Sequence, residues 1–196
     1  MATSLANKER KKYEKIWRYS QYRAFSAGRG LVPLFKSMCP KRGTVLDIGC
    51  GTGRASLELK ENGYTPSMLD HASNCRDFEA EIFPFYRKCV WAPWKIKNKF
   101  DYGYCCDMME HIPSERVHDT LREIMANCHR AFFSISFNAD ALGPTLLGEP
   151  LHLTVMNFED WILTLSAHGD LVEARDMLGQ GIFLLNKARF INGDSA

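Results

Sequence analysis

At 196 residues and a net charge of +2, the chain has the length of one globular domain that can bury a substantial core. Hydrophobic residues make up 45% and charged residues 24% of the sequence, an ordinary balance for a globular protein. No apolar run approaches the roughly 18 residues of a membrane span and the N-terminus is too charged for a signal peptide, so we expect neither a membrane protein nor a secreted one.

The cysteines point to a reducing compartment. There are seven of them, an odd number, and no two form a Cys-x-x-Cys pair. This pattern argues against a zinc ribbon and against a disulfide framework. Reduced thiols are normal in a cytoplasm, so we expect a cytoplasmic protein.

Positive charge is concentrated at the N-terminus. Residues 1–44 contain eleven Lys/Arg and two acids, a net charge of +9, whereas the other 152 residues contain fourteen Lys/Arg and twenty-one acids, a net charge of −7. Tyr13, Ile16 and Trp17 have the i, i+3, i+4 spacing of one helix face, which predicts a helix over residues 8–19 that turns them inward. A second helix is expected over residues 31–38.

We therefore expect residues 1–39 to form a basic helical cap ahead of a domain of residues 40–196. Two interpretations of this segment stay open. It is a solvated cap, or it is a lid that contacts a cofactor, an anionic substrate or a nucleic acid. Tyr22, Arg23 and Ser26 lie closest in sequence to the glycine-rich turn described next, so they are the candidates to reach a bound cofactor.

Residues 45–53 read Val-Leu-Asp-Ile-Gly-Cys-Gly-Thr-Gly and combine an apolar strand, an acid and three glycines at alternate positions. Helix-forming residues follow from Arg54 to Asn62, which predicts a strand, a tight turn and a helix, the first unit of an α/β sheet. Glycines let a ligand approach the main chain without a Cβ in the way. The candidate cofactor contacts in this stretch are Asp47, Gly49, Cys50, Gly51 and Gly53.

The glycine spacing separates two classes of cofactor. A dinucleotide fold uses Gly-x-Gly-x-x-Gly to place a pyrophosphate at the helix N-terminus. Here the third glycine comes one residue early, and the Asp47 carboxylate would repel a pyrophosphate but accept hydrogen bonds from a cationic ligand. The stretch resembles motif I of the class I S-adenosylmethionine (AdoMet) methyltransferases, whose cofactor carries an amino-acid tail and a sulfonium. The resemblance covers about residues 40–190.

A second strand is expected over residues 65–69 and ends in Asp70. An acid about 20 residues beyond the glycine turn is placed to accept hydrogen bonds from both ribose hydroxyls of a nucleoside cofactor. AdoMet and NAD both carry these hydroxyls. His71 follows directly and opens an expected helix that runs through residue 82.

A third strand is expected at Cys89-Val-Trp91, with Ala92 directly after it. Many relatives in the resembled family carry an acid near this position that meets the adenine amine, and this sequence has none from residue 83 to residue 98. Trp91 is the candidate wall for the adenine ring, and an ordinary core tryptophan is the alternative.

A fourth strand is expected over residues 102–106, ending where an α/β sheet presents its ligand crevice, with Cys106 near the methionine part of the cofactor. Residues 100–113 resemble motif IV of the same methyltransferases, including the Glu-His-Ile-Pro ending of small-molecule and ubiquinone-type members. Asp107, Glu110 and His111 follow at i, i+3 and i+4, so they share a face if the segment makes one helical turn.

Two chemical interpretations of these side chains stay open. In one, a residue of the group is the general base that takes the acceptor's proton. In the other, the group binds a divalent metal that lowers the pKa of an acceptor hydroxyl. Asp-x-x-Glu-His resembles the Glu-x-x-Glu-His of ubiquinone-pathway O-methyltransferases and small-RNA 3′-terminal 2′-O-methyltransferases, and His152 is the candidate fourth ligand or base. We do not favour the metal, because Asp107 is shorter than the Glu of that pattern.

The remaining elements are expected in the order helix 114–127, strand 131–137, loop 138–152, a helix around Trp161, and strands 171–175 and 182–190. Gly179 and Gly181 predict a hairpin return and hence an antiparallel edge. The expected fold is α/β and Rossmann-like, with a mostly parallel seven-stranded sheet, an antiparallel last strand and helices on both faces.

The expected activity is methyl transfer from AdoMet to a hydroxyl or amine of a small molecule, with S-adenosylhomocysteine as product. A 2′-hydroxyl of RNA or another nucleic acid is an alternative acceptor. A non-catalytic AdoMet-binding subunit of a methyltransferase complex is an alternative from another class. The sequence leaves open whether the protein is a monomer or a homodimer.

Overall fold

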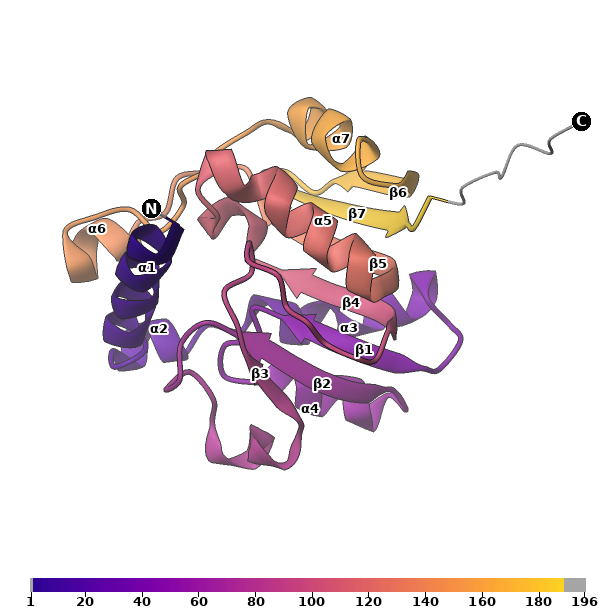
Figure 1. Cartoon of the computed structure of the whole chain (residues 1–196), viewed down its shortest axis with the longest axis horizontal. Coiled ribbons are helices and arrows are strands. Elements are labelled where there is room, and N and C mark those ends of the chain that lie inside the picture. The colour runs from indigo at the N-terminus through magenta and orange to yellow at the C-terminus, as the bar shows by residue number, and fades with distance from the viewer. Residues whose placement is uncertain (1, 189–196) are drawn as a thin grey trace, which may run out of the picture.

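The computed structural model describes residues 2–188, which fold around one seven-stranded sheet (Figure 1). Along the sheet the strands are β3 (Phe85–Arg87), β2 (Thr65–Asp70), β1 (Thr44–Ile48), β4 (Phe100–Cys106), β5 (Cys128–Ser136), β7 (Gln180–Asn186) and β6 (Asp170–Asp176). The pairs from β3 to β5 are parallel, whereas β7 runs antiparallel to both β5 and β6. The predicted mostly parallel sheet with an antiparallel last strand is confirmed.

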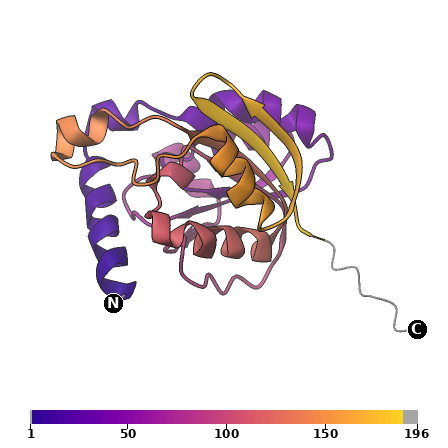
Figure 2. The ribbon, with the colours of Figure 1, turned by 90° about the horizontal axis from the view of Figure 1, so that it is seen from above.

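Helices cover both faces of this sheet (Figures 1 and 2). α3 (Ala27–Met38) and α4 (Arg54–Glu61) pack on one face, and α5 (Val117–Asn127) and α7 (Phe158–Ser166) pack on the other. Successive side chains of a strand point to opposite faces. Val45 of β1 therefore packs toward α3 and α4, while Leu46 and Ile48 pack toward α5.

The order of the strands indicates where on the sheet a ligand site is expected. β1 pairs with β2 on one side and with β4 on the other, so the order reverses between β1 and β4. In open α/β sheets, ligands bind beyond the carboxyl ends of the strands at this reversal. The residues that follow β1, β2 and β4 are therefore brought to one edge.

The N-terminal helices lie at that edge. α1 (Ala2–Ile16) contacts α6 (Leu142–Leu147), and both stand at the same end of the molecule (Figures 1 and 2). The short α2 (Ser20–Arg23) connects α1 to α3. Ile16 is fully buried and Trp17 is 9% exposed. The Tyr13 and His111 rings meet edge-on with centroids 5.9 Å apart. The inward direction predicted for these side chains is confirmed.

The segment between β2 and β4 differs from the prediction. The third strand is β3 at Phe85–Arg87, while Cys89–Trp91 lies in a turn in which the Ala92 amide donates to the Cys89 carbonyl. The apolar character of Cys89–Trp91 reflects burial in a turn and not strand pairing. The helix expected from His71 onward is reduced to the 3₁₀ turn η1 (Phe78–Ile82), because the main chain of residues 71–77 is held by side-chain hydrogen bonds.

Other boundaries also move. α1 begins at Ala2 and α3 at Ala27, both earlier than expected. The expected helix 114–127 divides into the 3₁₀ turn η3 (Ser114–Arg116) and α5, and the expected loop 138–152 contains α6. β7 ends at Asn186, and residues 189–190 of the predicted last strand lie outside the described residues. Within the described part of the chain, no helix has the length and apolar character needed to cross a membrane.

Candidate functional site

A cavity of about 140 Å³ lies at the carboxyl edge of the sheet, between the ends of β1, β2 and β4 and the α1–α3 region. The predicted cofactor residues that line it are Tyr22, Ser26, Asp47, Gly49, Cys50, Gly51, Asp70, His71, Trp91 and Cys106. Of the predicted catalytic residues, Asp107 and His111 line it. Residues from five separate stretches of sequence are thus brought together around one space.

Five predicted site residues are not among the cavity-lining residues: Arg23, Gly53, Ala92, Glu110 and His152. Arg23 is engaged elsewhere, since its guanidinium donates to the Asp77 carboxylate at 2.5 Å and to the carbonyls of Asn74 and Arg76. Gly53 has φ +78°, and a Cβ added there would lie 2.5 Å from the Ala80 Cβ. The third glycine is therefore required by backbone geometry and packing.

Asp47 lies at the end of β1 in an almost fully buried position. Its carboxylate accepts a hydrogen bond from the Ser56 hydroxyl of α4 at 2.7 Å. Burial raises the pKa of Asp47 to about 7; the Ser56 hydrogen bond opposes this rise, and the nearby Asp70 charge adds to it. This carboxyl therefore changes charge near neutral pH.

Asp70 is held in place by the main chain on both sides of it. One carboxylate oxygen accepts from the Gly51 amide at 3.1 Å, and the other accepts from the Ala72 amide at 2.8 Å. Burial raises the pKa of Asp70, and these amide hydrogen bonds oppose the rise. The interactions fix the carboxylate beside the glycine turn.

The side chain of Trp17 covers the glycine turn. Gly51 has φ +50°, and a Cβ added there would come within 2.8 Å of the Trp17 ring. Only glycine allows both this backbone conformation and this close approach. α1 and the turn after β1 therefore form one wall of the cavity together.

His71 and Trp91 form another wall. Their rings meet edge-on with centroids 6.2 Å apart, and both side chains line the cavity. Burial lowers the pKa of His71 to about 4, so its imidazole is neutral at physiological pH. A neutral aromatic pair suits a flat, uncharged ring system.

The residues after β4 form a cluster of acids and histidines. Ligand-type atoms of Asp107, His111 and His152 all lie within 4.8 Å of one another, and the two imidazole rings meet edge-on with centroids 4.7 Å apart. The His111 Nδ1 pairs with the Leu151 carbonyl at 3.3 Å, and the His152 Nδ1 pairs with the Asn138 carbonyl at 2.5 Å. Each Nδ1 then carries the proton, which leaves the two Nε2 atoms as acceptors.

Glu110 does not belong to this group of ligand atoms and does not line the cavity, although its side chain lies beside Asp107. It is fully buried, and one of its oxygens accepts from the Ser136 amide at 2.7 Å. Burial, aided by the nearby Asp107, raises the pKa of Glu110 well above its ordinary value. The geometry of Asp107, His111 and His152 fits either a divalent ion or a general base; the metal interpretation stays a prediction.

The backbone explains why the predicted helical face does not form. Asp107 has φ +55°, a left-handed conformation, and Met108 has φ −135°. Only Met109–His111 form the 3₁₀ turn η2, so Asp107 lies outside it. Left-handed non-glycine residues are uncommon and gather at functional sites. This conformation cannot be read from the Asp-Met-Met-Glu-His sequence.

Sequence reasoning missed several lining residues. Those from the N-terminal region are Tyr13, Trp17, Phe25, Ala27 and Gly28. The Tyr13 hydroxyl and the Trp17 indole Nε1 are buried and have no hydrogen-bond partner. Buried polar atoms are normally paired, so these two groups beside the cavity are candidates for contact with a ligand. The available signal is the helical spacing of Tyr13 and Trp17, which predicts an inward face but leaves open whether the segment is a cap or a lid that contacts a cofactor.

The side chains that line the cavity are acidic or uncharged, and many of them are aromatic. Among the described residues that line it, three are acids and none is Lys or Arg. Two basic residues of α1 form ion pairs within the protein: Lys12 with Glu9 at 2.5 Å and Arg10 with Glu14 at 2.8 Å. Lys12 and Glu9 are both buried, so Lys12 does not act as an exposed charge.

Comparisons with known proteins agree with this fold. The model of a family described as "Methyltransferase domain" matches residues 16–178. The PH0226 protein of Pyrococcus horikoshii OT3 is similar, with 15% identity, a TM-score of 0.69 and coverage of 87% of this chain and 93% of that chain. No curated protein matches the sequence closely enough to be a relative.

Two further similar structures hold S-adenosylhomocysteine. The Burkholderia thailandensis 1,6-didemethyltoxoflavin-N1-methyltransferase is 18% identical with a TM-score of 0.66, and the match covers 96% of this chain and 89% of that chain. The magnesium protoporphyrin IX methyltransferase of Synechocystis PCC 6803 is 17% identical with a TM-score of 0.61, and the match covers 82% of each chain. At these identities the likeness is one of fold. Because the family model spans most of the sequence, the chain belongs to the methyltransferase domain family and has the class I AdoMet-dependent methyltransferase fold.

Proposed function

We propose that this chain binds AdoMet in the cavity at the carboxyl edge and directs its methyl group to a hydroxyl or amine of an uncharged small molecule. The observation that carries the proposal is the set of groups around one cavity: Asp47, the Gly49–Gly51 turn and Asp70, with no cationic side chain among the described lining residues. Three acidic side chains favour a ligand of net positive charge, and AdoMet carries a sulfonium and an ammonium against one carboxylate.

Each part of the cavity suits one part of this cofactor. Asp70 accepts hydrogen bonds from the ribose hydroxyls, and its carboxylate is already held in place for this by the Gly51 and Ala72 amides. Asp47 accepts from the ammonium group, directly or through water. His71 and Trp91 enclose the adenine between neutral rings. AdoMet, when bound, supplies the electrophilic methyl group for an in-line displacement.

The chain's own contribution to the reaction is alignment and proton removal. Tyr13, Trp17 and Tyr22 enclose the space on the α1 side of the turn, and the Trp17 and Tyr22 rings pack edge-on at 4.6 Å. Holding two reactants in line supplies much of the acceleration in such a transfer. His111 faces the same cavity and takes the acceptor proton at Nε2, while Asp107 stabilises the imidazolium that forms.

The charges around the cavity favour an uncharged acceptor. An anionic acceptor such as an RNA phosphodiester would approach Asp107 with no lysine or arginine among the described lining residues to offset the repulsion. The basic residues of α1 that are paired within the protein add no cation to the cavity. We therefore place a small phenolic, hydroxyl or heteroaromatic N–H compound ahead of a nucleic acid.

An acceptor screen tests this proposal. Purified protein is incubated with methyl-labelled AdoMet and matched pairs of phenols and heteroaromatic amines, each with and without a carboxylate or phosphate, alongside short RNA. We expect kcat/KM for the neutral member of a productive pair to exceed that of its anionic partner by at least about tenfold, which corresponds to 1.4 kcal/mol. Equal or faster methylation of the anionic compounds or of RNA would contradict the uncharged-acceptor proposal.

Chelation separates the two interpretations of the Asp107–His111–His152 cluster. Because we assign proton removal to His111 itself, turnover is expected to be the same in EDTA as in Mg²⁺ or Mn²⁺. The measurement is the rate of S-adenosylhomocysteine formation after dialysis against EDTA and after each ion is restored. Loss of turnover in EDTA with recovery on metal addition would replace the base by a metal site on these three residues.

The pKa of Asp47 predicts pH-dependent cofactor binding. Because the pKa is raised to about 7 and the ionised form receives the ammonium, AdoMet affinity should rise roughly tenfold or more between pH 5.5 and pH 7. Calorimetry near pH 6 in two buffers with different ionisation enthalpies should detect the release of about one proton per AdoMet bound. Asp47→Asn should bind weakly at every pH without this slope.

The same residue has an opposite effect on ligand-free stability. The folded pKa of Asp47 lies above its unfolded value, so its favourable contribution is full at pH values below about 4 and is lost as pH rises through about 7. Asp47→Asn should therefore raise the melting temperature of ligand-free protein at pH 8. A lower melting temperature for this variant at pH 8 would contradict the assigned pKa.

A further inference from the structure

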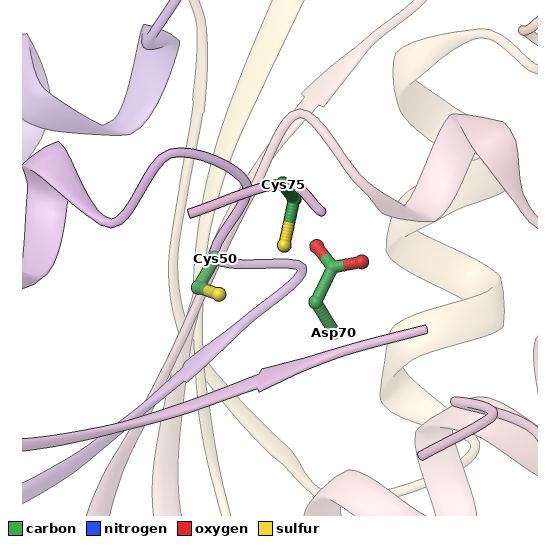
Figure 3. Close-up of side chains that lie close together, drawn as sticks. All are labelled: Cys50, Asp70 and Cys75. Carbon is green, nitrogen blue, oxygen red and sulfur yellow. The ribbon is translucent and has the colours of Figure 1, made fainter. Parts of the chain in front are cut away.

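Two thiols and a carboxylate meet next to the glycine turn. Figure 3 shows the Cys50 and Cys75 sulfurs and the Asp70 carboxylate directed toward one space. One ligand-type atom from each residue lies within 4.8 Å of the other two. Cys50 follows β1, Asp70 ends β2 and Cys75 lies in the loop before η1, so three separate segments supply the group.

This geometry is close to that of a metal site. With metal–sulfur bonds of about 2.3 Å at tetrahedral angles, neighbouring ligand atoms lie roughly 3.7 Å apart, so the three atoms need to move by only about 1 Å. Two thiolates with one carboxylate are a donor set for Zn²⁺ and similar thiophilic ions. We propose that Cys50, Asp70 and Cys75 bind one thiophilic divalent ion, and that this ion competes with the cofactor for Asp70.

The surrounding structure holds the three side chains in position. The Asp70 oxygens are fixed by the amides of Gly51 and Ala72, and the Cys75 thiol donates to the Ala72 carbonyl at 3.3 Å. The loop that carries Cys75 is tied down from outside, because Arg23 donates to the carbonyls of Asn74 and Arg76. Prior ordering of this kind lowers the entropic cost of binding an ion.

Binding requires the thiols to give up only weak hydrogen bonds, including the one from Cys75 to the Ala72 carbonyl at 3.3 Å. The Cys50 thiol makes only a long contact to the Gly51 carbonyl, at 3.7 Å, and thiols are weak donors. Binding exchanges two S–H bonds for two metal–sulfur bonds, so two protons leave to solvent for each ion bound. Two thiolates and one carboxylate around a divalent ion leave a net charge of −1 at the site.

The ion would reach the site through the cofactor cavity. Cys50 and Asp70 line that cavity, whereas Cys75 lies behind them among Met68, Ala72, Ala80 and Phe83. A fourth ligand such as water would come from the cavity, because Cys50 and Asp70 line it. The competition with AdoMet rests on the proposed function, because only a ribose bound at Asp70 would exclude the ion. Binding of the ion to the three side chains does not depend on the proposed function.

Spectroscopic titration with Cd²⁺ and Co²⁺ tests the site on the full chain, kept reduced under inert gas and without AdoMet. We expect a thiolate-to-metal charge-transfer band that saturates at one ion per chain. Cys75→Ser should weaken binding by more than the roughly 10–100-fold that follows loss of an outer-shell partner. Cys75 does not line the cavity, so this variant should keep its AdoMet affinity.

Cys89→Ser is the matched control, because Cys89 is the partly exposed thiol of the loop after β3 and lies outside the cluster. It should leave the band and its stoichiometry unchanged. Absence of the band in the wild type, its persistence in Cys75→Ser, or its loss in Cys89→Ser would overturn the site. Saturating AdoMet should abolish the band. If calorimetry shows that AdoMet binds and the band is unchanged, the shared use of Asp70 is overturned. If calorimetry shows no AdoMet binding, that result counts against the proposed function alone.

Discussion

Replacement of His111 by glutamine is expected to lower kcat by about 10²–10⁴-fold, the usual contribution of a positioned general base. The side chain lines the cavity, its Nδ1 is fixed on the Leu151 carbonyl, and burial lowers its pKa to about 4. The imidazole is therefore neutral at physiological pH, but it is a weak base unless the imidazolium is stabilised when it forms. The nearby Asp107 favours the protonated form once it appears. The measurement is steady-state turnover with an acceptor identified by the screen.

A control histidine separates catalysis from general loss of fold. His118 is exposed and pairs with His168 at 2.8 Å, on α5 away from the cavity. His118→Gln should keep both kcat and AdoMet affinity, whereas His111→Gln should keep AdoMet affinity and lose kcat. Turnover at the wild-type rate in a folded His111→Gln protein would remove the base assignment.

Replacement of Asp70 by alanine is expected to weaken AdoMet binding by at least roughly 10- to 150-fold, because each lost hydrogen bond to a charged group costs about 1.5–3 kcal/mol. The variant loses the bonds to both ribose hydroxyls and leaves the Gly51 and Ala72 amides without their acceptor. Calorimetric titration with AdoMet and S-adenosylhomocysteine measures the loss, and Asp70→Asn shows how much one retained acceptor restores.

Asp101 offers a matched acidic control. Its carboxylate accepts from the Thr44 amide at 2.8 Å and from the Thr44 hydroxyl at 2.9 Å, near the starts of β1 and β4 and so at the opposite edge of the sheet. Asp101→Ala should lower the melting temperature, because both hydrogen bonds to Thr44 are lost, while AdoMet affinity stays the same. If Asp70→Ala and Asp101→Ala affected AdoMet affinity equally, the assignment of Asp70 to the ribose would be wrong.

The parts of this fold that could be predicted are those determined by local pattern. The strand, glycine turn and helix over residues 45–62 form as expected because apolar β-branched residues, glycines and helix formers follow one another there. Asp70 reaches the cavity because parallel strands β1 and β2 end together, which the motif spacing already implied. Family resemblance strengthened these predictions without changing the residues that carry them.

The parts that could not be predicted depend on contacts between distant segments. Trp17 closes over Gly51, a pairing across 34 positions that no periodicity reveals. Asp107 has a left-handed backbone and lies outside the turn of Met109–His111, so the single helical turn on which a shared face depended does not form. Arg23 has the charge for a ligand but is engaged by Asp77, which lies 54 positions further along the chain.

Calorimetric titration of the wild-type protein with S-adenosylhomocysteine, AdoMet and NAD tests the central claim most directly. The account predicts one site per chain with micromolar-range affinity for the first two ligands, tightening for AdoMet as pH rises toward 7, and no heat of binding for NAD. Saturable binding of NAD, or the absence of binding of both AdoMet and S-adenosylhomocysteine by folded protein, would contradict the account.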